Sequence, residues 1–131
     1  MIKSEHQKNI TLKRIKEFKK HLNDLDEWSS GSVNSIIGQL EQELEEYERL
    51  KKGEYTLPKN IPFGELLKCI AKVRISKGLS QQDLANLLGL TKQQINRYEE
   101  YDYQNVSLSK INEILEVLGL TVSLEHFKKA A

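Results

Sequence analysis

The sequence predicts a mainly all-α protein: an N-terminal helical hairpin, a second helical domain and a short C-terminal β-strand. Three observations support this fold class. Apolar residues recur at helical spacing through most of the chain, and two prolines and a glycine interrupt that spacing within 52–62. Strict apolar–polar alternation occurs only at 120–125. We therefore place a domain boundary in the interruption, with the hairpin at 1–57 and the second domain at 58–131.

The predicted hairpin consists of two amphipathic segments. The first, 11–25, has the apolar face Ile15, Phe18, Leu22 and Leu25. The second, 32–51, has the apolar face Val33, Ile37, Leu40, Leu44 and Tyr47. Between them, 26–31 is rich in turn residues and contains the only tryptophan. The apolar spacing is coiled-coil-like but too short for a long rod, so we expect an antiparallel pair. Its apolar face must be buried within the hairpin, on the second domain or on a partner chain.

Residues 80–99 carry the most informative pattern in the chain. Ser80 can cap a helix whose apolar residues are Leu84, Ala85, Leu87 and Leu88. Gly89 suits the left-handed conformation that ends a helix. Thr91 can then cap a second helix that has Ile95 on its inner face. Two short helices joined by a glycine-containing turn are the helix-turn-helix signature, which places the second helix in the DNA major groove.

With these residues in place, 64–124 resembles the lambda-repressor-like (Xre/Cro) helix-turn-helix family. The similarity is carried by RISKGLSQQDLA at 74–85, LGLT at 88–91 and the single residues Ile95, Tyr98, Glu99, Ser107, Leu108, Leu118 and Gly119. The resemblance implies a helix at 63–77 packed behind the motif and an Arg74–Glu99 pair. It also implies a last helix, capped by Ser107, that buries Leu108, Ile111, Ile114, Leu115 and Leu118.

The resemblance also implies which residues meet DNA bases: Lys92, Gln93, Asn96 and Arg97, with Gln94 as an alternative neighbour. The residue types suit this role, because Arg and Lys donate to guanine O6 and N7 and Gln pairs with adenine. The resemblance implies a phosphate contact for Gln81, and the side chains of Thr91, Gln104 and Ser107 can also donate to phosphate. Thr91 could equally be a simple helix cap. Lys72, Lys77 and Lys110 are weaker phosphate candidates.

One segment departs from the family pattern. Many relatives have glycine and basic residues after the second motif helix, whereas this chain has the carboxylates Glu99, Glu100 and Asp102. Three carboxylates beside DNA would weaken binding, unless the neighbouring tyrosines pack Glu100 and Asp102 away from it. The loop is also a plausible protein-contact surface.

The alternating segment 120–125 predicts a strand with no partner strand in its own chain. Unpaired ladder groups are costly to bury, so we expect it to pair with the same strand of a second copy in a symmetric dimer. The alternative is an extended tail.

Composition sets further bounds. The chain has 20 basic and 19 acidic side chains, so any electrostatic attraction to DNA must be local. The only cysteine, Cys69, cannot form an internal disulfide, and no secretory signal or membrane-spanning segment is expected. We therefore expect a cytoplasmic protein. No metal-ligand spacing, phosphate loop or nucleophile–base pair is present, so we expect no metal, no cofactor and no catalysis.

These observations predict a sequence-specific double-stranded DNA-binding regulator. We expect a homodimer, formed through the C-terminal strand, the hairpin or both, that represses its own operon at a palindromic site. The N-terminal half also resembles the HigA class of antitoxins, in its layout and in a few residues such as Tyr47, Glu48 and Pro62. The alternative function is therefore an antitoxin whose hairpin binds a small toxin protein. An ordinary dimerisation or sensor appendage would explain the hairpin as well.

Overall fold

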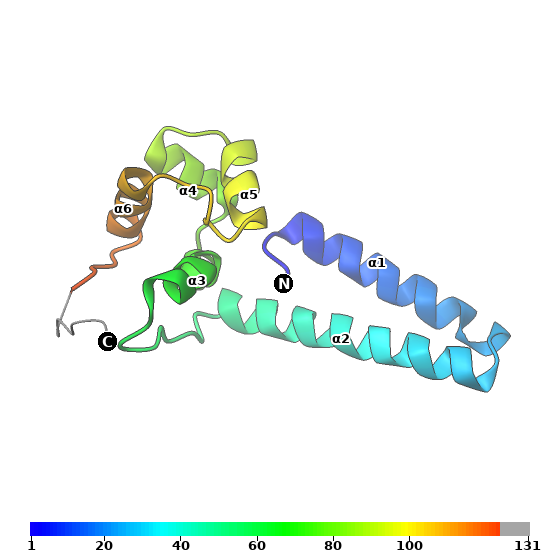
Figure 1. Cartoon of the computed structure of the whole chain (residues 1–131). Coiled ribbons are helices and arrows are strands. Elements are labelled where there is room, and N and C mark those ends of the chain that lie inside the picture. Colours follow the sequence, from blue (N-terminus) through cyan, green and yellow to red (C-terminus); the bar gives the residue numbers. More distant parts are fainter. Residues whose placement is uncertain (124–131) are drawn as a thin grey trace.

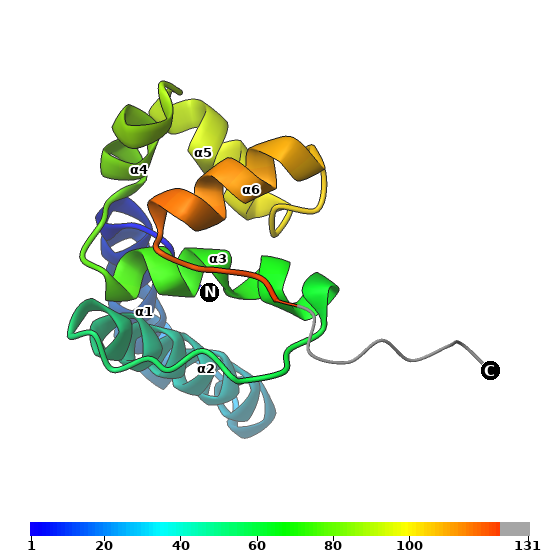
Figure 2. The same cartoon turned by 90° about the vertical axis from the view of Figure 1, so that its left-hand side faces the viewer.

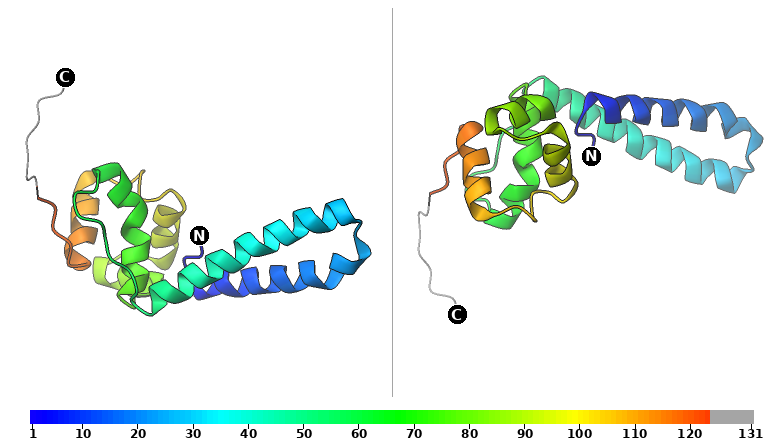
Figure 3. Two further views of the ribbon diagram at one scale, coloured as in Figure 1. Left: turned by 90° about the horizontal axis from the view of Figure 1, so that it is seen from below. Right: turned by 90° about the horizontal axis from the view of Figure 1, so that it is seen from above.

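A computed structural model describes residues 1–123, and Figure 1 shows its helices in chain order. A long hairpin consists of α1 (Glu5–His21), a 3-10 turn (Leu22–Asp24) and α2 (Glu27–Lys51). Four shorter helices follow: α3 (Phe63–Ser76), α4 (Gln81–Leu88), α5 (Lys92–Glu100) and α6 (Leu108–Val117). The hairpin projects from one side of the four-helix domain in both views of Figure 3. No helix within 1–123 has the length and apolar character needed to cross a membrane.

The hairpin helices begin earlier than the sequence predicted. The Ser4 side chain accepts a hydrogen bond from the Gln7 amide, so α1 starts at Glu5 rather than near Thr11. Asp26 caps α2 in the same way through the Ser29 amide, 2.7 Å away. The predicted connector at 26–31 is therefore mostly the first turn of a helix. Good N-caps outweighed the turn-forming residues, because a satisfied N-terminus stabilises the helix by about 1 kcal/mol.

The hairpin has a small apolar cluster of its own, and the four-helix domain has a larger one. The hairpin cluster contains Ile15, Ile37 and Leu40, with Phe18, Val33 and Leu44 packed against it. The helical domain buries Leu66, Ile70, Val73, Leu84, Ala85, Ile95, Tyr103, Ile111, Ile114, Leu115 and Leu118. Figure 2 shows α4, α5 and α6 on one side of α3, with the hairpin on the other.

A third apolar cluster joins the two parts of the molecule. Ile2 is only 3 % exposed and packs with Tyr47 and Leu50 of α2 and with Ile75 of α3. The extended segment before α1 therefore fills the junction between the hairpin and the helical domain. Packing of the hairpin on the second domain was one of the alternatives that the sequence left open, but the contribution of Ile2 was not predicted.

The predicted C-terminal strand is wrong within the residues that the structure describes. Gly119 ends α6 in a left-handed conformation, with φ 73°, and the Leu120 amide then donates to the Leu115 carbonyl at 2.8 Å. Residues 120–123 continue without secondary structure along α3 (Figure 2). The single chain offers this segment no partner strand, and exposed backbone groups at 121–123 can bond to water instead. The last two residues of the predicted strand, 124 and 125, lie outside the described residues.

Three leucines predicted to be buried are exposed. Leu25 follows the 3-10 turn and is 38 % exposed. Leu87 is 59 % exposed, because the buried face of α4 is centred on Leu84 and Ala85 and Leu87 lies on its flank. Leu108 is 72 % exposed. It is the first residue of α6, and side chains tilt toward the N-terminus of a helix, so it points beyond the helix end.

Candidate nucleic-acid interface

The first motif helix, α4, is fixed at its start by reciprocal hydrogen bonds. The Asp83 amide donates to the Ser80 hydroxyl at 3.0 Å, and the Ser80 amide donates to the Asp83 carboxylate at 2.9 Å. The hydrogen bonds that the Asp83 carboxylate receives from the backbone amide and side chain of Ser80 hold its pKa below its usual value. A capping box of this kind satisfies two amides that the helix leaves free. The cap predicted from sequence is thus present, and Asp83 completes it.

The turn between the motif helices has the geometry that the sequence predicted. Gly89 adopts φ 67°, ψ 29°, and the Leu90 amide donates to the Ala85 carbonyl at 2.9 Å. Thr91 then caps α5 by accepting from the Gln94 amide at 3.2 Å, and the Gln94 side chain accepts from the Thr91 amide at 2.9 Å. The two short helices are thereby held at a defined angle, with their contact filled by Leu84, Ala85 and Ile95, all 0 % exposed.

The outer face of α5 presents unused hydrogen-bond donors. Lys92, Gln93 and Arg97 are exposed and form no hydrogen bond or ion pair with any residue in 1–123. Asn96 is half-buried and weakly tied, with contacts of 3.4 Å to Gln81 and to Glu100. Gln94, the alternative neighbour, is occupied by the cap of its own helix. The predicted base-reading residues therefore share one face, and three of the four are free to bind.

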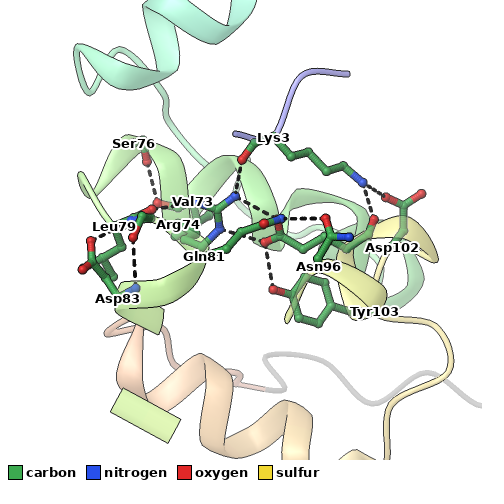
Figure 4. Close-up of polar contacts among 12 residues, drawn as sticks. Lys3, Val73, Arg74, Ser76, Leu79, Gln81, Asp83, Asn96, Asp102 and Tyr103 are labelled. Atoms are coloured by element: carbon green, nitrogen blue, oxygen red, sulfur yellow. Dashed lines mark hydrogen bonds and ion pairs between the residues drawn. The ribbon is translucent and has the colours of Figure 1, made fainter. Parts of the chain in front are cut away.

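A buried ion pair holds α5 against α3 from behind (Figure 4). Arg74 donates through Nε to Glu99 Oε2 and through Nη2 to Glu99 Oε1, both at 2.8 Å. Nη1 also donates to the Leu79 carbonyl at 2.7 Å, just before α4. One guanidinium thus contacts the elements on both sides of the motif, which supports a fixed orientation of α5.

Two further donors complete the shell of the Glu99 carboxylate. The side-chain amide of Gln81 donates to Glu99 Oε1 at 2.9 Å, and the Tyr103 hydroxyl donates to Glu99 Oε2 at 3.0 Å. Burial and the adjacent carboxylate raise the pKa of Tyr103 well above its usual value, so this hydroxyl stays a donor. Gln81 is only 4 % exposed. The structure therefore places this predicted phosphate-binding residue in an interior network, on the inner side of the motif.

The extended N-terminal segment also contacts this network. The Lys3 carbonyl accepts from Arg74 Nη2 at 2.7 Å. The Lys3 ammonium group donates to the carbonyl of Glu99 and lies 3.5 Å from the Asp102 carboxylate. Lys3 thus places a positive charge at the C-terminal end of α5, where the helix dipole favours a cation. The sequence analysis missed Lys3, because no local pattern reports a contact with a residue 96 positions away. It missed Tyr103, whose partner Glu99 is only four residues away, because the positive φ of Asp102 and Tyr103 that turns this side chain inward has no glycine to signal it.

The acidic segment at the C-terminal end of α5 is largely neutralised. Glu99 is buried against Arg74, and Asp102 pairs with Lys3, so only Glu100 among the three carboxylates is exposed without a cationic partner in 1–123. Asp102 and Tyr103 both adopt positive φ, 50° and 59°, which turns Tyr103 into the core. The tyrosine thus packs on Glu99 rather than on Glu100 or Asp102.

The remaining phosphate candidates lie on the surface. Thr91 is exposed, with its hydroxyl engaged in the cap of α5. Gln104 is exposed and its side chain forms no hydrogen bond within the described chain. Ser107 caps α6 by accepting from the Lys110 amide at 3.3 Å. No group of three or more potential metal-ligating side chains is found in the described residues.

The fold and this exposed, rigidly supported helix define a DNA-binding helix-turn-helix domain. A family model described as helix-turn-helix matches residues 70–124. This segment is therefore a helix-turn-helix domain of the lambda-repressor-like (Xre) type, the kind found in DNA-binding transcriptional regulators. Comparisons with curated proteins and with solved structures gave no match.

Proposed function

We propose that this protein is a sequence-specific repressor that binds double-stranded DNA upstream of its own gene. The observation that carries the proposal is the free donor set on α5, where Lys92, Gln93 and Arg97 project from a helix locked in place by Arg74 and Glu99. Because the helix backbone is already fixed, binding costs only the ordering of these side chains. Bidentate contacts to base edges discriminate by about 1–3 kcal/mol each.

In this proposal α5 enters the major groove, and Asn96 provides a further contact to a base. In this proposal Gln104 and Ser107, after α5, donate to the phosphate backbone. The exposed Thr91 hydroxyl, before α5, does so by exchanging its 3.3 Å contact with Gln94 Oε1 for a phosphate oxygen. Gln81 acts indirectly, because its amide is committed to Glu99. Phosphate contacts of this type orient a protein on the duplex, whereas the α5 side chains select the sequence.

We propose that two copies bind a palindromic site, with half-sites about 10 base pairs apart or a multiple of that distance. We propose the hairpin as the element through which the two copies make contact. It carries exposed apolar side chains, including Leu12, Leu25, Trp28 and Ile36. Sedimentation of the full chain with and without DNA would measure the stoichiometry; one copy per symmetric site would contradict this part of the proposal.

The test of the main proposal is fluorescence anisotropy with labelled DNA from the region upstream of this gene. Scrambled DNA of the same composition is the control, and both are titrated across a salt series. We expect about a thousandfold or greater preference for the upstream DNA, as for other specific binders, with a steep salt dependence. Equal weak binding to both would contradict the proposal.

A second function, as an antitoxin, is favoured by the hairpin itself. It has its own apolar cluster, and Trp28 at its tip is 82 % exposed. Large exposed aromatic side chains are typical of protein-binding surfaces. The test is co-expression with any small protein encoded by the adjacent reading frame. Neutralised toxicity that is lost in Trp28→Ala would support the antitoxin function, whereas no complex between the two purified proteins would exclude that partner.

A further inference from the structure

The two helices of the hairpin carry opposite charge. Helix α1 has six Lys or Arg side chains and two acidic ones, whereas α2 has six acidic and two basic side chains. The net charges of the two helices cancel, so the composition of the hairpin does not reveal that they are opposite. The consequence for binding depends on which of these charges are already paired within the molecule.

Most of the carboxylates of α2 are paired internally. Glu41 pairs with Lys19 at 3.0 Å, Glu46 with Lys72 at 3.0 Å and Glu45 with Arg49 at 2.6 Å. Glu48 pairs with Lys8 of α1. Ion pairs within the hairpin and at its contact with α3 therefore compensate most of the negative charge of α2.

The opposite is true of α1. Lys13, Lys16 and Lys20 are exposed, and none has an acidic partner among residues 1–123. Their spacings of three and four residues put them on one helix face, together with Asn9 one turn earlier. Ile15, which packs against α2, lies on the other side of the helix. We name Asn9, Lys13, Lys16 and Lys20 the basic face of α1.

The basic face lies next to the proposed DNA interface. Glu5 and His6, in the first turn of α1, line a cavity of about 290 Å³ together with Gln82 of α4 and Lys92 of α5, and the Glu5 carboxylate there is paired with Lys51 of α2. Figure 1 shows α1 as the hairpin helix nearer to α5, while α2 lies nearer to α3. A duplex held by Lys92 and the start of α4 would therefore meet this side of α1 next.

We infer that the basic face of α1 binds the phosphate backbone of the duplex beyond the base pairs read by α5. The three lysines span about 10 Å along the helix, at 1.5 Å per residue. They are long, flexible point charges suited to phosphate rather than to base edges. The hairpin thereby extends the DNA footprint without adding sequence information. This inference rests on the proposed DNA-binding function.

The test compares the full-length protein with K13Q/K16Q/K20Q and with a control, K52Q/K59Q/K68Q. The control removes the same charge from exposed lysines outside the basic face. The probe is a duplex selected by the wild-type protein from a random pool, used with about 10 base pairs, or roughly one helical turn, of flanking DNA on each side and in a trimmed form. Circular dichroism verifies that all three proteins are folded.

On the long duplex we expect the salt-dependence slope to fall by about 2–3 per protein copy in K13Q/K16Q/K20Q, since each phosphate contact contributes about 0.9. The control should keep the wild-type slope. Only proteins with the basic face intact should prefer the long duplex. Unchanged slope and length preference in K13Q/K16Q/K20Q would overturn this inference without affecting the proposed function. Failure of the wild-type protein to select any duplex would overturn the proposed function as well.

Discussion

Arg74 and Glu99 are 25 residues apart in sequence and form a bidentate ion pair with both N–O distances at 2.8 Å. Their side chains are 2 % and 0 % exposed. A buried pair of this kind repays its desolvation only when the remaining donors and acceptors are also satisfied. Here Leu79, Gln81 and Tyr103 do so within the helical domain, and Lys3 does so from the N-terminal segment.

Removing one partner of this pair should be severely destabilising. We expect Arg74→Met to lower the free energy of unfolding by about 3–5 kcal/mol, because Glu99 would remain buried without its counter-charge. Urea denaturation measures the change. The double variant R74M/E99L should lose less free energy of unfolding than R74M alone, since it leaves no isolated buried charge. A loss below about 1 kcal/mol for R74M would contradict a structural role for the pair.

Two glycine substitutions should have opposite effects. Gly89→Ala forces alanine into a left-handed conformation at φ 67° and should cost about 1–2 kcal/mol. Gly38→Ala, within α2, should stabilise the protein by about 0.5–1 kcal/mol because alanine favours the helix. An added Cβ meets nothing within 4 Å at either position, so sterics do not complicate the comparison. Thermal unfolding of both variants measures the difference, and equal signs would contradict the assigned turn geometry.

The capping box of α4 should contribute to stability in a pH-dependent way. Hydrogen bonds from Ser80 hold the pKa of Asp83 below its ordinary value in the folded state. The unfolded chain therefore binds the proton more readily, and the contribution of Asp83 is full above about pH 4 and is lost as the pH falls through the lower, folded pKa. Urea midpoints should drop less between neutral and acidic pH in Asp83→Asn than in the wild type. An identical drop would show that the carboxylate charge is unimportant.

Arg97 and Gln81 should affect DNA binding differently. Arg97→Ala should relax preference at one base position, at a cost of about 1–3 kcal/mol on the preferred sequence. Gln81→Ala should weaken binding to all DNA sequences alike, because it removes a hydrogen bond to Glu99 that supports α5. Competition binding with single-base variants of the selected site measures both. Equal losses of Arg97→Ala on specific and random DNA would remove Arg97 from the base-reading set.

The sequence alone was sufficient for the helix-turn-helix motif, where structure depends on neighbouring residues. Ser80, Gly89 and Thr91 set the ends of α4 and α5 because capping and positive φ act over two to four positions. The exposed face of α5 could also be predicted, because helical periodicity puts Ile95 on the opposite face from Gln93 and Arg97. The missed starts of α1 and α2 at Ser4 and Asp26 were local signals as well.

Tertiary structure alone decided how these elements are joined. Gln81 became an interior donor, Tyr103 turned inward and Lys3 reached the end of α5, through contacts spanning 4 to 96 residues. The packing of α1 against α2 decided which lysines of α1 form ion pairs and which remain without an acidic partner. The apolar–polar alternation of the C-terminal segment predicted a strand. A strand requires a neighbouring strand, however, and the fold of the single chain places none beside residues 120–123. Sequence periodicity specifies which face of an element is apolar or charged, whereas the surface that covers or pairs with that face is a property of the whole fold.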